Sequence, residues 1–266
     1  MLRIIFFLLL IVHHTGCATS PKSATRNVAV AWNSEAGVAR LERSRHKSVF
    51  FKLAQNFEPQ ENGYFCGVAT AAIALNALRS TEGGFKRPVD ESKLPKEKRI
   101  YIPATHRPPV YERYTQHNVF LAGTKTELEV LGKPIEIKGK QTADFGLQIR
   151  QLHELMLAHQ LSSKLRIADA TFSDDQIRAE LVAALDDSGS VAIVNFKRSE
   201  IGQEGKGSHI SPLGAYDQVT DSFLILDVNS SLYSWVWADA AALIKGMRTF
   251  DMVENRGYLV VSERGH

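Results

Sequence analysis

The hydrophobic pattern of the chain changes from helical to strand-like near residue 190. Apolar residues in segment 63–78 (GYFCGVATAAIALNAL) recur at helical spacing, which predicts a buried helix whose first turn contains Cys66. The same spacing predicts a helix over residues 144–161. Another helix is expected after the capping-box residues Ser173 and Gln176.

Short β-rich runs dominate the rest of the chain. They cover residues 190–196, 209–216, 222–228, 233–237 and 257–262, and the sequence DQVTD between the second and third is typical of a hairpin turn. Helices therefore come first and an antiparallel sheet second. This order predicts an α+β fold, a helical lobe followed by an antiparallel sheet lobe in one domain. The Pro- and Gly-rich segment 80–113 is polar and predicts a long loop or insertion.

Composition narrows the class of protein. The 266 residues are 44% hydrophobic and 23% charged, which are globular proportions and argue against disorder, collagen-like repeats and coiled coils. The net charge is only +3 and no dense basic stripe is visible, so no nucleic-acid partner is expected. Two cysteines cannot form a disulfide scaffold or, alone, a thiolate metal site.

The N-terminus predicts export. Arg3 precedes nine apolar residues, 4–12, which are too few to span a bilayer but fit the core of a secretory signal. Thr15-Gly16-Cys17 resembles a bacterial lipobox, so residues 1–17 are expected to be a signal peptide with Cys17 as the lipidation site. Ordinary secretion and an uncleaved anchor are the alternatives. Residues 18–44 are expected to form a tether, and the location to be the periplasm or cell envelope, with a membrane contact through the lipid.

Cys66 is the sharpest chemical feature. A thiolate is the reactive form of cysteine, and the positive end of a helix dipole stabilises it. At the start of the predicted helix, Cys66 is a candidate nucleophile. The alternative is an inert cysteine buried in a core.

His209 and Asp227 are the candidate partners of this thiol. His209 follows a glycine-rich approach at a strand edge, and Asp227 closes the apolar strand that comes next. A buried carboxylate needs a partner, and strand–turn–strand spacing can bring Asp227 to His209. A surface histidine and a turn aspartate are the alternatives. Gln60, six residues before Cys66, is a candidate oxyanion donor beside the Cys66 backbone N–H.

The chain order Cys, His, Asp is that of a papain-like cysteine peptidase. Several segments resemble one papain-like family, the phytochelatin synthases (glutathione γ-glutamylcysteinyltransferases). The resemblance covers residues 45–262, and its main blocks are NGYFCGVA at 62–69, YTQHNVF at 114–120, GSHISPLGAY at 207–216 and LILDV at 224–228. One departure is that Asn229 and Ser230 follow Val228, where the eukaryotic members carry an arginine.

The resemblance implies a catalytic domain over 45–262 with Cys66, His209 and Asp227 as the triad and Gln60 as the oxyanion donor. It also implies glutathione as substrate, cleaved at its Cys–Gly amide to give γ-Glu-Cys or a phytochelatin. No tightly bound cofactor and no protein metal site are expected, and cadmium or zinc would enter as a thiolate complex of the substrate. The alternatives are a cysteine peptidase for another peptide and a non-catalytic lipoprotein that binds thiols or metal.

Overall fold

The computed structural model describes residues 29–79, 85–103, 105–106, 110–205 and 207–265. Its centre is one sheet of seven strands in the order β1-β10-β9-β8-β7-β11-β6, in which every neighbouring pair is antiparallel. The strands are β1 (Val30–Ala31), β6 (Ser162–Ile167), β7 (Ser190–Lys197), β8 (Ser208–Asp217), β9 (Ser222–Ile225), β10 (Val236–Asp239) and β11 (Gly257–Ser262). The predicted antiparallel sheet is confirmed.

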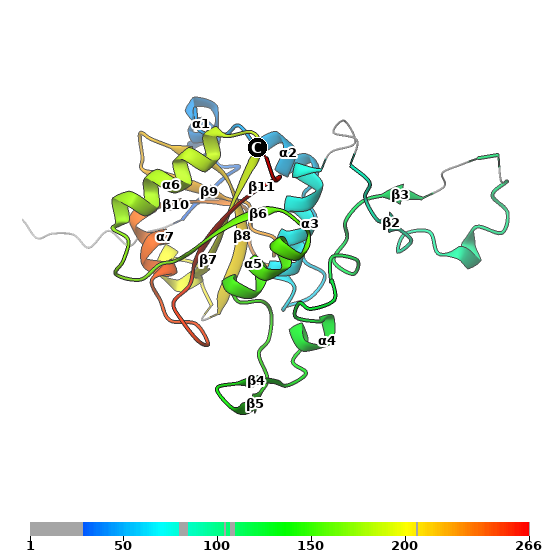
Figure 1. Ribbon diagram of the computed structural model, residues 1–266. Coiled ribbons are helices and arrows are strands. Elements are labelled where there is room, and N and C mark those ends of the chain that lie inside the picture. The colour runs from blue at the N-terminus through cyan, green and yellow to red at the C-terminus, as the bar shows by residue number, and fades with distance from the viewer. Residues whose placement is uncertain (1–28, 80–84, 104, 107–109, 206, 266) are drawn as a thin grey trace, which may run out of the picture.

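Helices cover both faces of this sheet, with α3 and α5 on one side and α6 and α7 on the other (Figure 1). The α-helices are α1 (Glu35–Arg43), α2 (Phe50–Gln55), α3 (Cys66–Leu78), α4 (Glu127–Val130), α5 (Ile149–Ala158), α6 (Asp174–Asp186) and α7 (Ala240–Met247). Covering on both sides explains why nearly every residue of β7 and β8 is buried, rather than every second one. The α+β fold class is thereby confirmed.

Helix α3 is apolar on all sides and lies in the core. All its residues from Gly67 to Ala77 are buried, as expected for a helix that is hydrophobic all round. Thr70 Oγ1 donates to the backbone oxygen of Ile210 at 3.2 Å, which links the second turn of α3 to β8. A Cβ on Gly67 would lie 3.0 Å from Leu147 Cβ, so glycine allows this close approach.

The predicted helices and strands differ from the structure mainly at their ends. The helix expected over 144–161 begins only after Gln148, and Phe145 lies outside it with an exposed ring. Gly146 has a φ of 76°, a left-handed conformation that keeps the chain before α5 out of the helix. Segment 80–113 is predicted to be a long loop or insertion, and the part of it that the structure describes is mostly loop. Its described part holds a small hairpin, β2 (Val89–Asp90) with β3 (Tyr111–Glu112), and the 3-10 turn η2 (Lys96–Lys98), and it projects from the body (Figure 1).

A second hairpin, β4 (Ile135–Ile137) with β5 (Lys140–Thr142), lies outside the main sheet. The 3-10 turn η3 (Arg198–Ile201) follows β7. In the described part of the chain, no helix combines the length and the apolar character needed to cross a bilayer. The expected signal peptide 1–17, Cys17 and residues 18–28 of the expected tether lie outside the described residues.

The expectation of a tether is wrong for residues 29–44. Val30 and Ala31 form the edge strand β1 against β10, and Ser34 caps α1 by accepting a hydrogen bond from Gly37 N. Helix α1 also contacts the sheet, since Trp237 Nε1 in β10 donates to Gly37 O at 3.0 Å. The folded domain therefore begins before residue 45. The strand is too short and the helix too polar for their burial to show in the sequence pattern.

We expect Gly37→Ala to destabilise the domain, because α1 packs too closely on the preceding segment to admit a side chain. A Cβ at Gly37 would lie 2.1 Å from Ala31 O, a backbone atom that cannot move cheaply. Overpacking of this kind lowers the free energy of unfolding by about 2 kcal/mol, measured by urea denaturation. Val38→Ala, at an exposed position of the same helix, is the control and should unfold like the wild type. Equal stability of all three proteins would contradict the docking of α1.

Candidate active site

Cys66, His209 and Asp227 meet where α3 faces the sheet. Cys66 is the first residue of α3, His209 is the second residue of β8, and Asp227 follows β9, the neighbour of β8. Antiparallel pairing of β8 with β9 is what brings residues 209 and 227 together. His209 Nε2 lies 2.8 Å from Asp227 Oδ1, and the His209 side chain is hydrogen-bonded to Cys66. Since Nε2 faces the aspartate, Nδ1 is the ring nitrogen available to the thiol.

The electrostatics of these residues favour an ion pair of thiolate and imidazolium. Burial alone raises the pKa of the Cys66 thiol, but the hydrogen bond and charge of His209, with the N–H groups of Ile210 and Gly67, lower the pKa below its usual value. Burial likewise lowers the pKa of His209, and the bonds and charges of Asp227 and Cys66 outweigh it and raise the pKa. A lowered thiol pKa beside a raised imidazole pKa is the condition for a nucleophilic cysteine at neutral pH.

Asp227 is fully buried and remains ionised. Burial raises the pKa of this carboxyl, but hydrogen bonds and charges from His209 and Arg198 bring it far below its usual range. Ser211 adds a further contact, with its Oγ 2.8 Å from His209 Nε2 and accepting from Val228 N. Phe196 packs edge-on against the imidazole, with ring centroids 5.8 Å apart. The ring of His209 is therefore held on several sides.

A cleft of about 490 Å³ opens at Cys66. Its lining comes from segment 143–148 with Tyr64, from the start of β8 and from the segment before β11. Tyr64 and Phe145 stack at 4.8 Å on the rim. The part of the lining before β11 carries charge, since Arg256 donates to Asp251 Oδ1 at 3.1 Å and to Ser208 Oγ at 2.9 Å. The cleft lining thus contains an ion pair of a guanidinium and a carboxylate, and Arg256 also donates to Thr249 Oγ1 and Phe250 O.

A buried ion pair anchors the wall of the cleft formed by segment 143–148. Lys125 Nζ donates to Asp144 Oδ2 at 2.8 Å and to the backbone oxygens of Asp144 and Gly146, and both charged side chains are only 4% exposed. Gln148 and Gln151 donate to the same carboxylate oxygen. Complete pairing of this kind offsets the cost of burying two charges.

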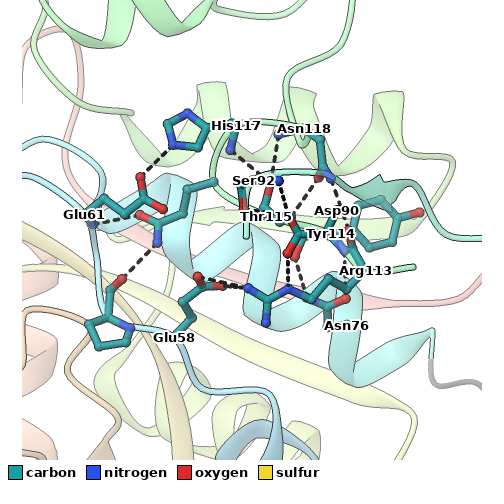
Figure 2. A network of polar contacts seen from close by, with 12 residues as sticks. Glu58, Glu61, Asn76, Asp90, Ser92, Arg113, Tyr114, Thr115, His117 and Asn118 are labelled. Atoms are coloured by element: carbon teal, nitrogen blue, oxygen red, sulfur yellow. Dashed lines mark hydrogen bonds and ion pairs between the residues drawn. The ribbon is translucent and has the colours of Figure 1, made fainter. Parts of the chain in front are cut away.

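Segment 113–118, which contains part of one motif of the family resemblance, fixes the residues that precede Cys66. Figure 2 shows that Arg113 forms ion pairs with Glu58 and Asp90, and that His117 pairs with Glu61. Asn76 exchanges two hydrogen bonds with the backbone of Tyr114, which joins the same segment to α3. Gln116 donates to Pro59 O and accepts from Glu61 N. Residues 58–61 therefore have a fixed position relative to the nucleophile helix.

Comparison with known proteins identifies the family. The family model named phytochelatin synthase matches residues 22–93 and 99–258. The chain belongs to the phytochelatin synthase family. Residues 45–262, which carry the resemblance seen in the sequence, lie largely within this match. The family expected from the sequence is confirmed.

Curated relatives include glutathione γ-glutamylcysteinyltransferases from three organisms. The chain is 27% identical to enzyme 3 of Lotus japonicus, 23% identical to that of Schizosaccharomyces pombe and 29% identical to enzyme 1 of Triticum aestivum. Each match covers 80% or 81% of this chain and 37%, 43% and 36% of the relative. The chain thus spans less than half the length of these relatives. Among solved structures, a C39-like peptidase of Bacillus anthracis aligns with a TM-score of 0.38 and 14% identity, over 79% of this chain and 95% of that chain.

The structure brings three of the expected site residues together and leaves the role of Gln60 a prediction. Gln60 N donates to Val228 O at 2.8 Å, next to Asp227, so its backbone lies at the site. Its Nε2 donates to Asn62 O at 2.6 Å, which uses one amide hydrogen within the loop, and its buried Oε1 has no partner. Among the residues that the structure describes, no cluster of three His, Cys, Asp or Glu side chains is arranged to hold a metal ion.

The sequence did not reveal which cations lie in the site. Arg198 is buried and pairs with Asp227, and Arg248 pairs with Asp174. Arg256 is the arginine in the cleft wall. Its position just before β11 places it beside the start of β8 only through non-local strand pairing, which no local pattern indicates. The pairing of Lys125 with Asp144 is hidden for the same reason.

Removing the charge of Lys125 should destabilise the fold and the cleft wall. Lys125→Met leaves the Asp144 carboxylate buried without its cation, which costs about 3 kcal/mol in free energy of unfolding. Urea denaturation measures this change. Arg150→Gln, which breaks an exposed pair with Glu254, is the control and should change stability by less than about 1 kcal/mol. A Lys125 variant as stable as the control would show that the buried pair is dispensable.

The contribution of His117 to the stability of the folded protein should depend on pH. Burial lowers its pKa, but hydrogen bonds and charges from Glu61 and Glu127 outweigh burial and raise the pKa. A raised folded pKa gives stability that is complete below the unfolded value of about 6.5 and is lost as pH rises through the folded value. His117→Gln should therefore lower Tm at about pH 6 and have less effect at about pH 9. His106→Gln, at an exposed histidine, is the control, and a Tm difference for His117→Gln that grows with pH would refute the assignment.

Proposed function

We propose that this protein is a cysteine-dependent acyltransferase or hydrolase that cleaves the Cys–Gly amide of glutathione. The observation that carries the proposal is that Cys66, His209 and Asp227 are linked by hydrogen bonds and that Cys66 lines a cleft, in a chain of the phytochelatin synthase family. The names of the curated relatives support glutathione as the substrate.

The first half-reaction would form a thioester. His209 Nδ1 accepts the thiol proton, and Cys66 Sγ attacks the carbonyl carbon of the cysteinyl residue. The backbone N–H of Cys66 and the amide of Gln60 would stabilise the oxyanion. When the C–N bond breaks, the imidazolium returns its proton to the leaving amine of glycine. The product is a γ-glutamylcysteinyl thioester on Cys66, while Asp227 stays ionised and keeps the imidazole oriented.

The charged wall of the cleft suits the other end of glutathione. The γ-glutamyl group ends in an α-carboxylate and an α-ammonium group on one carbon. Arg256 and Asp251 present the complementary charges side by side. We assign the ammonium group to Asp251. The N–H groups of Arg256 already donate to Ser208, Thr249, Phe250 and Asp251, so Arg256 would have to exchange one of these partners to bind the α-carboxylate.

The second half-reaction decides the product. Water would release γ-Glu-Cys, and the amine of a second glutathione would extend the chain to a phytochelatin. Cadmium or zinc would take part as a thiolate complex of the glutathione substrate. The proposed location is the periplasm or cell envelope through a lipid on Cys17, and its support is the signal-like sequence of residues 1–17.

Replacing Cys66 should abolish glycine release. The purified protein is incubated with glutathione, with and without cadmium, and the products are identified by mass spectrometry. We expect glycine with γ-Glu-Cys or longer γ-Glu-Cys chains from the wild type, and none from Cys66→Ala. Cys17→Ser removes the other cysteine and is the matched control, with wild-type turnover expected.

The products distinguish hydrolysis from transfer. γ-Glu-Cys alone would define a hydrolase, and longer chains a synthase. No glycine release by the wild type under either condition would reject glutathione as substrate and direct attention to other peptides or to thiol binding. Turnover by a folded Cys66→Ala variant would reject the nucleophile.

A further inference from the structure

Arg198 makes a two-pronged contact with the carboxylate of Asp227. Its Nη1 donates to Oδ2 at 2.5 Å and its Nη2 to Oδ1 at 3.1 Å, while Oδ1 also accepts from His209 Nε2 and from Asn229 N. The aspartate is fully buried, and the arginine side chain is only 6% exposed. An interaction that would be weak on a surface is therefore shielded from water, and the orientation of the carboxylate depends on it.

Arg198 is itself held in place by residues from two other segments. Its Nη1 also donates to Gln203 Oε1 at 2.6 Å, and its guanidinium carbon lies 3.8 Å from the ring centroid of Tyr233. Tyr233 in turn donates to Glu204 O at 2.8 Å. The loop between η3 and β8 and the segment after Asp227 thus close on the guanidinium. Such fixation leaves Arg198 little freedom to exchange partners.

We propose that Arg198 is a positioning residue, which holds the Asp227 carboxylate at the angle that keeps Oδ1 on His209 Nε2 and thereby directs His209 Nδ1 at Cys66. A carboxylate bonded on one oxygen only can turn about its Cβ–Cγ bond. The guanidinium binds both oxygens in one plane and removes that freedom. Arg198 is absent from the residues that line the cleft, so it acts on the reaction through Asp227 rather than on the substrate.

The inference rests on the proposed function only in taking Cys66 as the nucleophile, and it holds for any acyl substrate. Within the described part of the chain, the ionisable groups bonded to Asp227 are Arg198 from η3 and His209 from β8, and beyond His209 lies the Cys66 thiol from α3. A simple electrostatic role and a positioning role of Arg198 predict opposite effects. Arg198 is separated from Cys66 by Asp227 and His209, so loss of its charge acts more strongly on His209 than on the thiol and by itself favours the imidazolium that stabilises the thiolate. Loss of orientation would instead disfavour the ion pair.

The test measures the alkylation of Cys66 by iodoacetamide, which needs no glutathione. In a Cys17→Ser background only Cys66 reacts, and rates are followed from about pH 5 to pH 9. Positioning predicts that Arg198→Gln slows alkylation at about pH 6 roughly tenfold and shifts the profile toward that of an ordinary thiol. A folded Arg198→Gln variant with an unchanged or faster rate at that pH overturns the proposal.

A matched control comes from another arginine that binds a buried aspartate in the same two-pronged way. Arg43 donates from Nε and Nη2 to the two oxygens of Asp217, at the far end of β8. Arg43→Gln should leave the alkylation profile unchanged, which separates positioning from a general loss of stability. Circular dichroism and Tm establish that each variant is folded.

Two further variants decide whether Arg198 acts through Asp227. In an Asp227→Asn background, Arg198→Gln should change the rate less than about twofold, because the partner through which it acts is gone. Multiplicative losses would overturn the proposal. Arg198→Lys keeps the charge without the planar fork and should give an intermediate profile. If Arg198→Gln does not fold, the Arg198→Lys variant serves as the test. A wild-type alkylation profile for Arg198→Lys would show that the two-pronged contact is not needed.

If these variants behave as expected while the wild type releases no glycine from glutathione, the substrate is wrong and the positioning role stands. If glycine is released and the alkylation profiles do not change, the reaction stands and the role of Arg198 fails.

Discussion

The buried carboxylate of Asp227 is the interaction on which the rest of the site depends. A fully buried anion is costly unless it is paired, and this one is paired with both an arginine and a histidine. The pairing fixes His209, and the oriented imidazole in turn lowers the pKa of the Cys66 thiol. The sheet supplies two of these groups and α3 supplies the third. The distance and angle between Cys66 and His209 therefore depend on how α3 packs on β8.

That packing is close because small residues line the contact. Gly67 lets α3 approach Leu147 and Ile210, and Thr70 bonds to the backbone of β8. Around this contact, separate polar networks fix the loops that form the cleft. The Lys125–Asp144 pair holds the wall at 143–148, and segment 113–118 holds the residues before Cys66. Each network uses hydrogen bonds to backbone groups, which leave loop residues fewer alternative conformations.

The family relationship and the geometry support the proposed function in different ways. The match of the family model over most of the chain, together with the relatives' names, points to glutathione. The geometry points to acyl transfer through a thioester, for whatever acyl group enters the cleft. The cleft connects the two arguments, because Arg256 and Asp251 give part of its lining an ionic character. The described part of segment 80–113 projects from the body and contributes no residue to the lining of the cleft (Figure 1).

The sequence by itself determined the fold class, the family and the three residues at the centre of the site. Helix α3 and the strands from β7 onward carry strong local patterns, and Cys66, His209 and Asp227 lie at their ends. Weak local signals hid α1, whose burial depends on Trp237 and the distant edge of the sheet. Only the tertiary structure decided that Arg198 faces Asp227 and that Arg256 faces the cleft. These charged side chains meet because pairing between strands brings distant segments together. Local sequence patterns do not predict that pairing.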